Sequence, residues 1–328
     1  MSNMQKLTHS PDPTASMTHK LYPAIEPFHT GLLETADKAH QIYFEECGNP
    51  DGTAVVVLHG GPGSGCNPGQ RRFFDPESYR IVLFDQRGCG RSQPAGKTEF
   101  NNTTLLAQDI ELLRQHLGIT TWMVFGGSWG STLALCYAAA FPGSITRLIL
   151  RGIFLARPHE LNWFLYEIRL FFPEAWERFT RILDGSERQD VLHAYASRIF
   201  NAPHIEQVLA AKTWSEYESR IMTLLPPPPP AEAAPEDSML SRLKVHLHYL
   251  SNGCFLEDAP VLSRIDRFRH IPTTIVHGRY DMVCPIRTAH ELHCAWPESE
   301  FIVVDEAGHS AMEPGIISTL VSITNRYR

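Results

Sequence analysis

The chain lacks the features that mark several common functional classes. Its 328 residues contain no basic run and carry a formal net charge of −7, which argues against a nucleic-acid partner. No apolar stretch is long enough to span a bilayer, and residues 1–20 lack the apolar core of a signal peptide. We therefore expect a cytoplasmic protein without a membrane partner, beginning with a flexible polar lead-in over residues 1–20.

Cysteine and histidine do not occur in the patterns of a disulfide framework or a metal site. The seven cysteines are scattered, and none belongs to a CxxC pair. The 16 histidines include no HExxH motif. These absences predict a reducing compartment, no metal and no cofactor. We expect a monomer or a small homo-oligomer.

What the sequence does contain is an alternation of apolar strand patterns and helical patterns. This alternation predicts an α/β fold, with a mostly parallel sheet covered by helices on both faces. The predicted strands are residues 40–48, which read as an edge strand, 52–61, 79–88, 122–125, 144–154, 272–281 and 300–309; the predicted helices are 102–118, 132–137, 288–296 and a last one from residue 314.

The composition and spacing of apolar residues change between residues 155 and 260. This segment has aromatic and charged residues at helical spacing and no buried-strand pattern. It predicts a helical cap inserted into a core formed by residues 21–154 and 261–328. The cap contains five consecutive prolines, Pro226 to Pro230, which favour an extended conformation. This run is either a stiff surface loop or a docking site for a partner.

The sequence GGSWG over residues 126–130 is the main catalytic signal. It contains the G-x-S-x-G pattern, in which a strand turns sharply into a helix and presents a serine hydroxyl. The apolar run before it and the helical run after it match that context. Ser128 is therefore the candidate nucleophile, although a glycine-rich turn without catalysis produces the same pattern.

A serine nucleophile needs a base and an acid, which follow it in chain order in α/β-hydrolases. Asp281 comes where a buried strand ends, and His309 lies in the loop after the last strand. A turn aspartate and a surface histidine are the alternatives. Weaker candidates for the acid are Asp258, Asp266 and Asp305, because none follows a central strand. His277 reads as a core residue rather than as the base.

Two backbone amides are expected to bind the oxyanion. Trp129 directly follows the serine, and Gly61 lies in the glycine-rich loop of residues 58–67. No GK[ST] follows this loop, which argues against a phosphate-binding site. The predicted mechanism is attack by Ser128 on a carbonyl, proton transfer to a histidine, and hydrolysis of an acyl-enzyme by water.

At this point the sequence resembles a known family. The blocks HGGPGSGCN, RIVLFDQRGCGRS, GGSWGSTLALCYA, LRGIFLAR, VHGRYDMVCP and AGHSAMEPG together are similar to those of prolyl aminopeptidases, also called proline iminopeptidases. The resemblance implies the α/β-hydrolase fold and removal of N-terminal proline from short peptides by serine chemistry without a metal. It also places the catalytic triad on Ser128, Asp281 and His309.

The resemblance further implies that the cap recognises the substrate. An acidic residue is expected to hold the charged N-terminus and aromatic residues to surround the proline ring. The matching residues are Glu218 in the stretch with Trp214 and Tyr217, and Phe154 in RGIF. A solvated helix glutamate and a core phenylalanine are the alternatives for Glu218 and Phe154.

The chain departs from the family pattern at a second cap glutamate. His246 stands at that position in LKVHLHYL, and Leu250 replaces an aromatic residue. The alternative is a different local alignment, which would bring another acidic residue, such as Glu236 or Asp237, to this place. A histidine cannot supply the missing negative charge, and in its neutral form it accepts one hydrogen bond.

Three functions remain open from the sequence. The leading hypothesis is a prolyl aminopeptidase, with N-terminal proline peptides as substrates. The second is a serine esterase or amidase of the same fold that acts on another small acyl compound. The third is a binding protein on a hydrolase scaffold without catalysis.

Overall fold

The computed structural model describes residues 18–226, 235–256 and 260–328. Most of the predicted lead-in, four of the five prolines of the proline run and Asp258 lie outside the described residues. Within them, no helix combines the length and the apolar character needed to cross a membrane.

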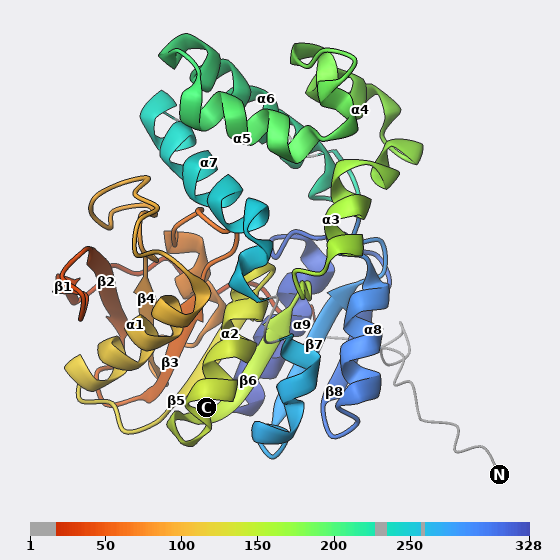
Figure 1. Cartoon of the computed structure of the whole chain (residues 1–328). Coiled ribbons are helices and arrows are strands. Elements are labelled where there is room, and N and C mark those ends of the chain that lie inside the picture. Colours follow the sequence, from red (N-terminus) through yellow and green to blue (C-terminus); the bar gives the residue numbers. More distant parts are fainter. Residues whose placement is uncertain (1–17, 227–234, 257–259) are drawn as a thin grey trace.

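An eight-stranded sheet forms the centre of the fold (Figure 1). The strands lie in the order β1-β2-β4-β3-β5-β6-β7-β8. β1 and β2 are antiparallel to their neighbours, and the pairs from β4 to β8 are parallel. The strand bounds are β1 His29–Glu34, β2 Gln41–Gly48, β3 Thr53–Leu58, β4 Tyr79–Phe84, β5 Trp122–Gly127, β6 Ile145–Arg151, β7 Thr273–Gly278 and β8 Glu300–Val304.

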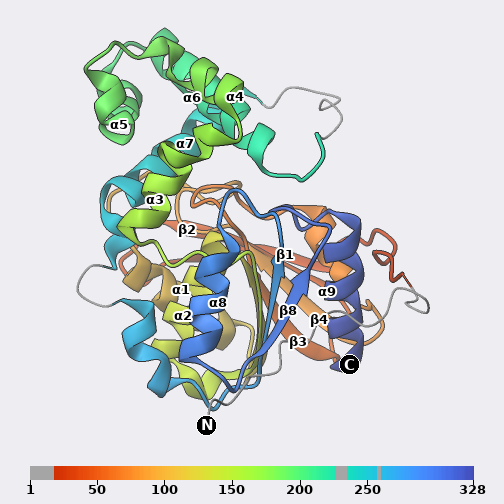
Figure 2. The same cartoon turned by 90° about the vertical axis from the view of Figure 1, so that its right-hand side faces the viewer.

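Helices cover both faces of this sheet, as the alternating sequence pattern predicts (Figure 2). α1 (Thr103–His116), α2 (Trp129–Ala140) and α8 (Ile286–Ala295) lie on one face, and α9 (Pro314–Arg326) lies on the other. Successive strand residues therefore enter different cores. Val56 and Val124 pack with α1 and α2, whereas Val57 and Phe125 pack with α9. The central strands consequently read as continuous apolar runs rather than alternating ones.

The sequence analysis did not predict β1, and it therefore placed residues 40–48, which include β2, wrongly at the edge of the sheet. β1 is mostly exposed or half-buried and pairs only with β2. Its pattern, HTGLLE, is short and contains a glycine, so it lacks the buried apolar run that marks the central strands. β2 is thus an inner strand, not an edge strand.

Among its described residues, the inserted segment contains helices and connecting loops but no strand. We propose residues 155–260 as a separate cap, because its helices stand beyond the carboxyl ends of the parallel strands (Figures 1 and 2). Its helices are α3 Pro158–Leu165, α4 Pro173–Phe179, α5 Val191–Asn201, α6 His204–Ile221 and α7 Glu236–Ser251. The short 3₁₀ helices of the chain are η1 Pro68–Phe73, η2 Pro142–Ser144, η3 Glu167–Leu170, η4 Thr180–Ile182, η5 Glu187–Gln189, η6 Gly253–Phe255 and η7 Val261–Arg267.

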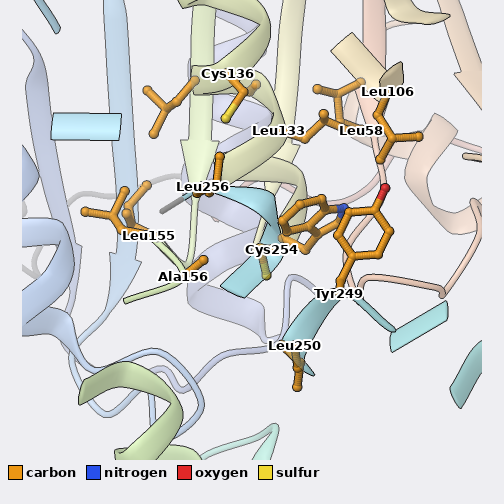
Figure 3. Close-up of a cluster of buried hydrophobic side chains, with 14 of the residues drawn as sticks. Leu58, Leu106, Leu133, Cys136, Leu155, Ala156, Tyr249, Leu250, Cys254 and Leu256 are labelled. Atoms are coloured by element: carbon orange, nitrogen blue, oxygen red, sulfur yellow. The ribbon is translucent and has the colours of Figure 1, made fainter. Parts of the chain in front are cut away.

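The end of α7 anchors the cap on the core. Figure 3 shows Tyr249 of α7 and Cys254 of the following η6 near core residues that include Leu58 and Leu133. The Tyr249 ring also meets the Trp129 ring edge-to-face, with 5.0 Å between the centroids. Because Tyr249 is 1% exposed and Trp129 is fully buried, this contact removes both rings from water. The cap is thus tied to the first residue of α2.

Candidate active site

The nucleophile candidate occupies a strained turn between β5 and α2. Ser128 has φ 58° and ψ −127°, in the positive-φ region that non-glycine residues rarely adopt. Its N–H donates to Arg151 O at 2.9 Å. The flanking glycines have no room for a side chain: a Cβ on Gly126 would lie 2.3 Å from Gly130 O, and one on Gly130 would lie 2.1 Å from a backbone oxygen at the end of β3. The motif therefore folds as the sequence pattern predicts.

The acid and base candidates meet at the carboxyl ends of β7 and β8. His309 Nδ1 lies 2.7 Å from Asp281 Oδ2, and both residues are buried. The other carboxylate oxygen accepts N–H bonds from Val283 at 3.0 Å and Cys284 at 2.8 Å. Burial alone would raise the pKa of Asp281, but the imidazole of His309, that of His277 and the Cys284 amide outweigh it and hold the pKa below its ordinary value. The carboxylate is thus charged and fixed in orientation.

The alternatives weighed from the sequence have other roles among the described residues. Asp266 pairs with Arg269, and Asp305 pairs with Arg279, both far from full burial. His277 is fully buried, accepts the Ile153 N–H on Nδ1 at 3.1 Å and faces Cys284 O with Nε2 at 2.8 Å. Since Nδ1 accepts, Nε2 carries the proton, and the ring is neutral. Burial also lowers the pKa of His277.

Ser128 and His309 line one cavity of about 340 Å³. Because His309 uses Nδ1 for Asp281, Nε2 is the nitrogen left for the serine. No hydrogen bond joins Ser128 Oγ to His309 within the described part of the chain. Cys284, whose thiol pKa is raised by burial, lines the same cavity. Catalytic hydrogen bonds are often loose without substrate. Proton transfer thus requires the hydroxyl to come within hydrogen-bond distance of the imidazole.

Two backbone N–H groups beside the serine have no acceptor among the described residues. They belong to Gly61 and Trp129, the residues expected to bind an oxyanion. A side-chain amide connects the two loops that carry them. Trp129 Nε1 donates to Gln86 Oε1 at 2.9 Å, and Gln86 Nε2 donates to His59 O at 3.0 Å. All three of these side chains are buried, so the two loops are held in one position relative to each other.

Three of the five cap-side or pocket residues expected to bind substrate line this cavity, and two do not. Glu218, His246 and Phe154 line it. Trp214 and Tyr217 are not among its lining residues, which corrects the expectation that they surround the substrate. Their rings instead form the core of the cap with Phe179, at centroid distances of 5.3 Å and 4.2 Å. The cap needs apolar mass of its own, and these two residues are 1% exposed.

The sequence analysis missed three charged residues on the cavity wall: Arg151, Glu160 and Arg242. Arg151 Nη1 donates to His309 O at 2.5 Å and so braces the loop of the base. Arg242 Nη2 donates to Glu218 at 2.5 Å. Arg242 precedes His246 by four residues on α7, and this spacing is the signal that places both on one helix face.

A backbone clip joins the cap to the loop of the catalytic histidine. Met222 O accepts the N–H groups of His309 at 3.0 Å and Ser310 at 2.9 Å. Glu313 adds a second link, since its carboxylate accepts from Gly308 N at 3.0 Å and Leu224 N at 3.2 Å. The position of the imidazole therefore depends on the segment that follows α6.

The chain is similar to known proteins over most of its length. The family model for the alpha/beta hydrolase fold matches residues 53–315. Proline iminopeptidases from Arabidopsis thaliana, Xylella fastidiosa and Neisseria gonorrhoeae are 48%, 46% and 45% identical to the chain. The matches cover 92%, 94% and 92% of this chain and 80%, 99% and 96% of those proteins.

Solved structures of low sequence identity share the fold. VinJ has a TM-score of 0.62 at 19% identity, covering 92% of this chain and 98% of that chain. An esterase from Exiguobacterium antarcticum has a TM-score of 0.60 at 22% identity, covering 90% of this chain and 100% of that chain. At these identities the likeness concerns the fold alone.

Proposed function

The chain belongs to the proline iminopeptidase family of α/β-hydrolases, and we propose that it is a serine aminopeptidase that releases proline from the N-terminus of peptides. The observation that carries the proposal is the arrangement around one cavity. Ser128, His309 and Gly61 line its core side, and the Glu218 carboxylate lines its cap side. Asp281 contacts His309 from behind, and the N–H groups of Gly61 and Trp129 have no acceptor among the described residues.

The proposed reaction follows from these positions. Ser128 Oγ attacks the carbonyl of the N-terminal proline while His309 Nε2 takes the hydroxyl proton, and Asp281 stabilises the imidazolium. The N–H groups of Gly61 and Trp129 bind the developing oxyanion. His309 then protonates the leaving amine. Water, deprotonated by the same imidazole, hydrolyses the prolyl ester and returns the serine.

The cap explains why an exopeptidase is the best match to the cavity. Glu218 is largely buried, and a buried ammonium requires a charged partner. A largely buried carboxylate on the wall of a cavity of about 340 Å³ provides such a partner for the charged N-terminus of a peptide. Phe154 supplies apolar surface for the proline ring. We therefore propose short peptides that begin with proline as the substrates.

A second candidate function is favoured by one contact. Arg242 already pairs with Glu218, so part of the negative charge is used within the protein. A serine esterase or amidase that acts on another small acyl compound does not need that charge. The same family membership and the same core chemistry are compatible with it.

One assay separates the two functions. Purified enzyme is given a prolyl arylamide, its N-acetylated form and a short acyl ester, with Ser128→Ala as the matched inactive control. We expect hydrolysis of the free-amine arylamide, at least about tenfold weaker hydrolysis of the acetylated form, and no hydrolysis by the control. Equal rates with and without the acetyl group would favour the esterase or amidase.

A cytoplasmic location is also proposed. All seven cysteines lie in the described residues and all are free thiols, the state that a reducing compartment maintains.

A further inference from the structure

Two hydrogen-bond acceptors face each other on the cap side of the cavity. Glu218 comes from α6 and His246 from α7, and Glu218 Oε1 lies 3.6 Å from His246 Nε2. The other carboxylate oxygen, Oε2, accepts from Arg242. Both side chains are mostly buried, with 14% of Glu218 and 7% of His246 exposed. Oε1 is thus the carboxylate oxygen directed toward the imidazole rather than toward the arginine.

The protonation state of His246 is determined by the core. Its Nδ1 lies 3.1 Å from Pro62 O, and a carbonyl oxygen only accepts, so Nδ1 carries the proton. Nε2 of the neutral ring then holds a lone pair. Burial lowers the pKa of His246 and Arg242 lowers it further, against the opposing effect of Glu218 and of the hydrogen bond to Pro62 O. The indole ring of Trp214 on α6 also packs edge-to-face on the imidazole, with 5.3 Å between the centroids.

The His246 lone pair has no partner in the described residues. Nε2 is buried and forms no hydrogen bond, although His246 lines the cavity. Buried polar atoms in proteins are nearly always hydrogen-bonded, and each exception calls for a reason. A donor supplied by a substrate is such a reason.

We propose that Glu218 Oε1 and His246 Nε2 together receive the two N–H groups of a secondary ammonium and so select N-terminal proline over residues with a primary ammonium. The inference rests on the proposed aminopeptidase function and adds the chemical basis of its selectivity. An N-terminal proline nitrogen is a secondary ammonium with two N–H donors, whereas every other N-terminal residue presents three. This pair of acceptors satisfies two donors, and a third donor buried without an acceptor weakens binding.

The geometry requires a small opening of the pair. A nitrogen about 2.9 Å from two acceptors, with donors at a tetrahedral angle, needs them about 4.7 Å apart. The observed separation is 3.6 Å. Glu218 and His246 therefore move apart by about 1 Å on binding. The bonds from Arg242 and to Pro62 O limit that movement and keep both acceptors directed at the same point.

The test compares substrates that differ in the number of N–H donors. Prolyl, N-methylalanyl and alanyl arylamides are assayed with wild type, His246→Leu, His246→Gln and the control His248→Leu. N-methylalanine has a secondary ammonium without a proline ring, so it separates amine type from ring shape. His248 lies on the same helix but contacts Asn101 O with Nε2 at 2.8 Å, away from the cavity.

Wild type is expected to prefer both secondary amines over the primary one. His246→Leu should lower kcat/KM for the secondary amines by about 10- to 100-fold, mainly through KM, because a hydrogen bond to a charged group is lost. The alanyl substrate should lose less, so the preference shrinks. His246→Gln, whose amide oxygen replaces the acceptor, should keep most of the preference, and His248→Leu should keep all of it.

Several results would overturn the inference. An unchanged KM and preference in His246→Leu would mean that the imidazole does not contact the amine. If the wild type cleaves the alanyl arylamide with the same kcat/KM as the N-methylalanyl arylamide, the enzyme does not discriminate by the number of N–H donors. If His246→Leu does not fold, a His246→Gln enzyme that has lost the preference would overturn it alone. Failure of the proposed function looks different, since wild type would then cleave none of the three arylamides or cleave N-acetylprolyl arylamide equally well.

Discussion

Gln86 connects the two loops that carry the candidate oxyanion donors, and its replacement makes a specific prediction. In Gln86→Met the side chain keeps its approximate volume and loses both polar atoms. The Trp129 indole N–H loses its acceptor at 2.9 Å, and His59 O loses its donor at 3.0 Å. Both groups stay buried. Each unpaired group costs about 1–3 kcal/mol, so the free energy of unfolding should fall by about 2–6 kcal/mol.

The same substitution should slow the chemical step. Complete loss of one oxyanion donor typically lowers kcat by about 10²- to 10³-fold. Gln86 acts through Trp129 and the loop of Gly61, so it is a positioning residue, and we expect a smaller loss of about 10- to 100-fold in kcat with KM little changed. Urea unfolding followed by tryptophan fluorescence gives the stability, and prolyl arylamide hydrolysis gives kcat and KM.

The control is Gln207→Met in the cap. Gln207 Nε2 donates one part-buried bond to Ala202 O at 2.9 Å and lies outside the cavity lining. This variant should lose about 1 kcal/mol or less and keep wild-type kcat. The reasoning is refuted if Gln86→Met is destabilised as predicted while kcat stays at the wild-type value, because Gln86 would then support the fold without ordering the oxyanion site.

Three further predictions follow from other contacts. Asp281→Asn should lower kcat by about 10⁴-fold with the fold intact, because an amide facing His309 favours the wrong tautomer; steady-state kinetics and circular dichroism check this, and a loss below about tenfold contradicts it. Glu313→Ala removes the acceptor that joins the histidine loop to Leu224. It should lower the free energy of unfolding by about 1–3 kcal/mol, and it should also lower kcat. An unchanged kcat would show that this link does not position the base. Burial alone would raise the pKa of Glu111, but hydrogen bonds from four side chains lower it from 4.5 to about 2. The contribution of the charged carboxylate to stability is therefore complete above about pH 5 and is lost as pH falls toward 2. The difference in free energy of unfolding between wild type and Glu111→Gln, measured by urea unfolding, should shrink over that range, and a difference that grows would contradict this.

The elements that form the core of the fold were predictable because their signals are local. The strand before Ser128 and the helix after it follow from an apolar run, a glycine turn and helical spacing, and the structure has β5 and α2 there. β1 gave no such signal, because its pairing with β2 rather than its own composition makes it a strand.

The candidate site divides in a similar way. Chain order and strand ends were sufficient to identify Asp281 and His309 as candidates, and the two side chains are 2.7 Å apart. The aromatic positions in the cap were less informative, because a ring can face the cavity or the interior of its own domain. The Trp214 ring faces the interior of the cap, and only the three-dimensional packing distinguishes this position from one that faces the cavity.

Contacts between distant segments left no pattern in the sequence. The ion pair of Arg242 with Glu218 joins two helices across 24 residues. Whether Nε2 of His246 has a partner depends on the groups packed around it, and among the described residues it has none. The link from Gln86 to Trp129 spans 43 residues. Such pairs depend on how α6, α7 and the core loops are oriented, which composition and periodicity do not encode.

Covalent labelling of the nucleophile tests the central claim most directly. The enzyme is treated with a fluorophosphonate, digested and analysed by mass spectrometry while residual hydrolysis of a prolyl arylamide is followed. A single adduct on Ser128 whose formation parallels the loss of activity, and which does not form in His309→Ala, is the predicted result. Full activity after complete labelling of Ser128, or inactivation through an adduct on another residue, would contradict the assignment of this serine, histidine and aspartate as the catalytic groups.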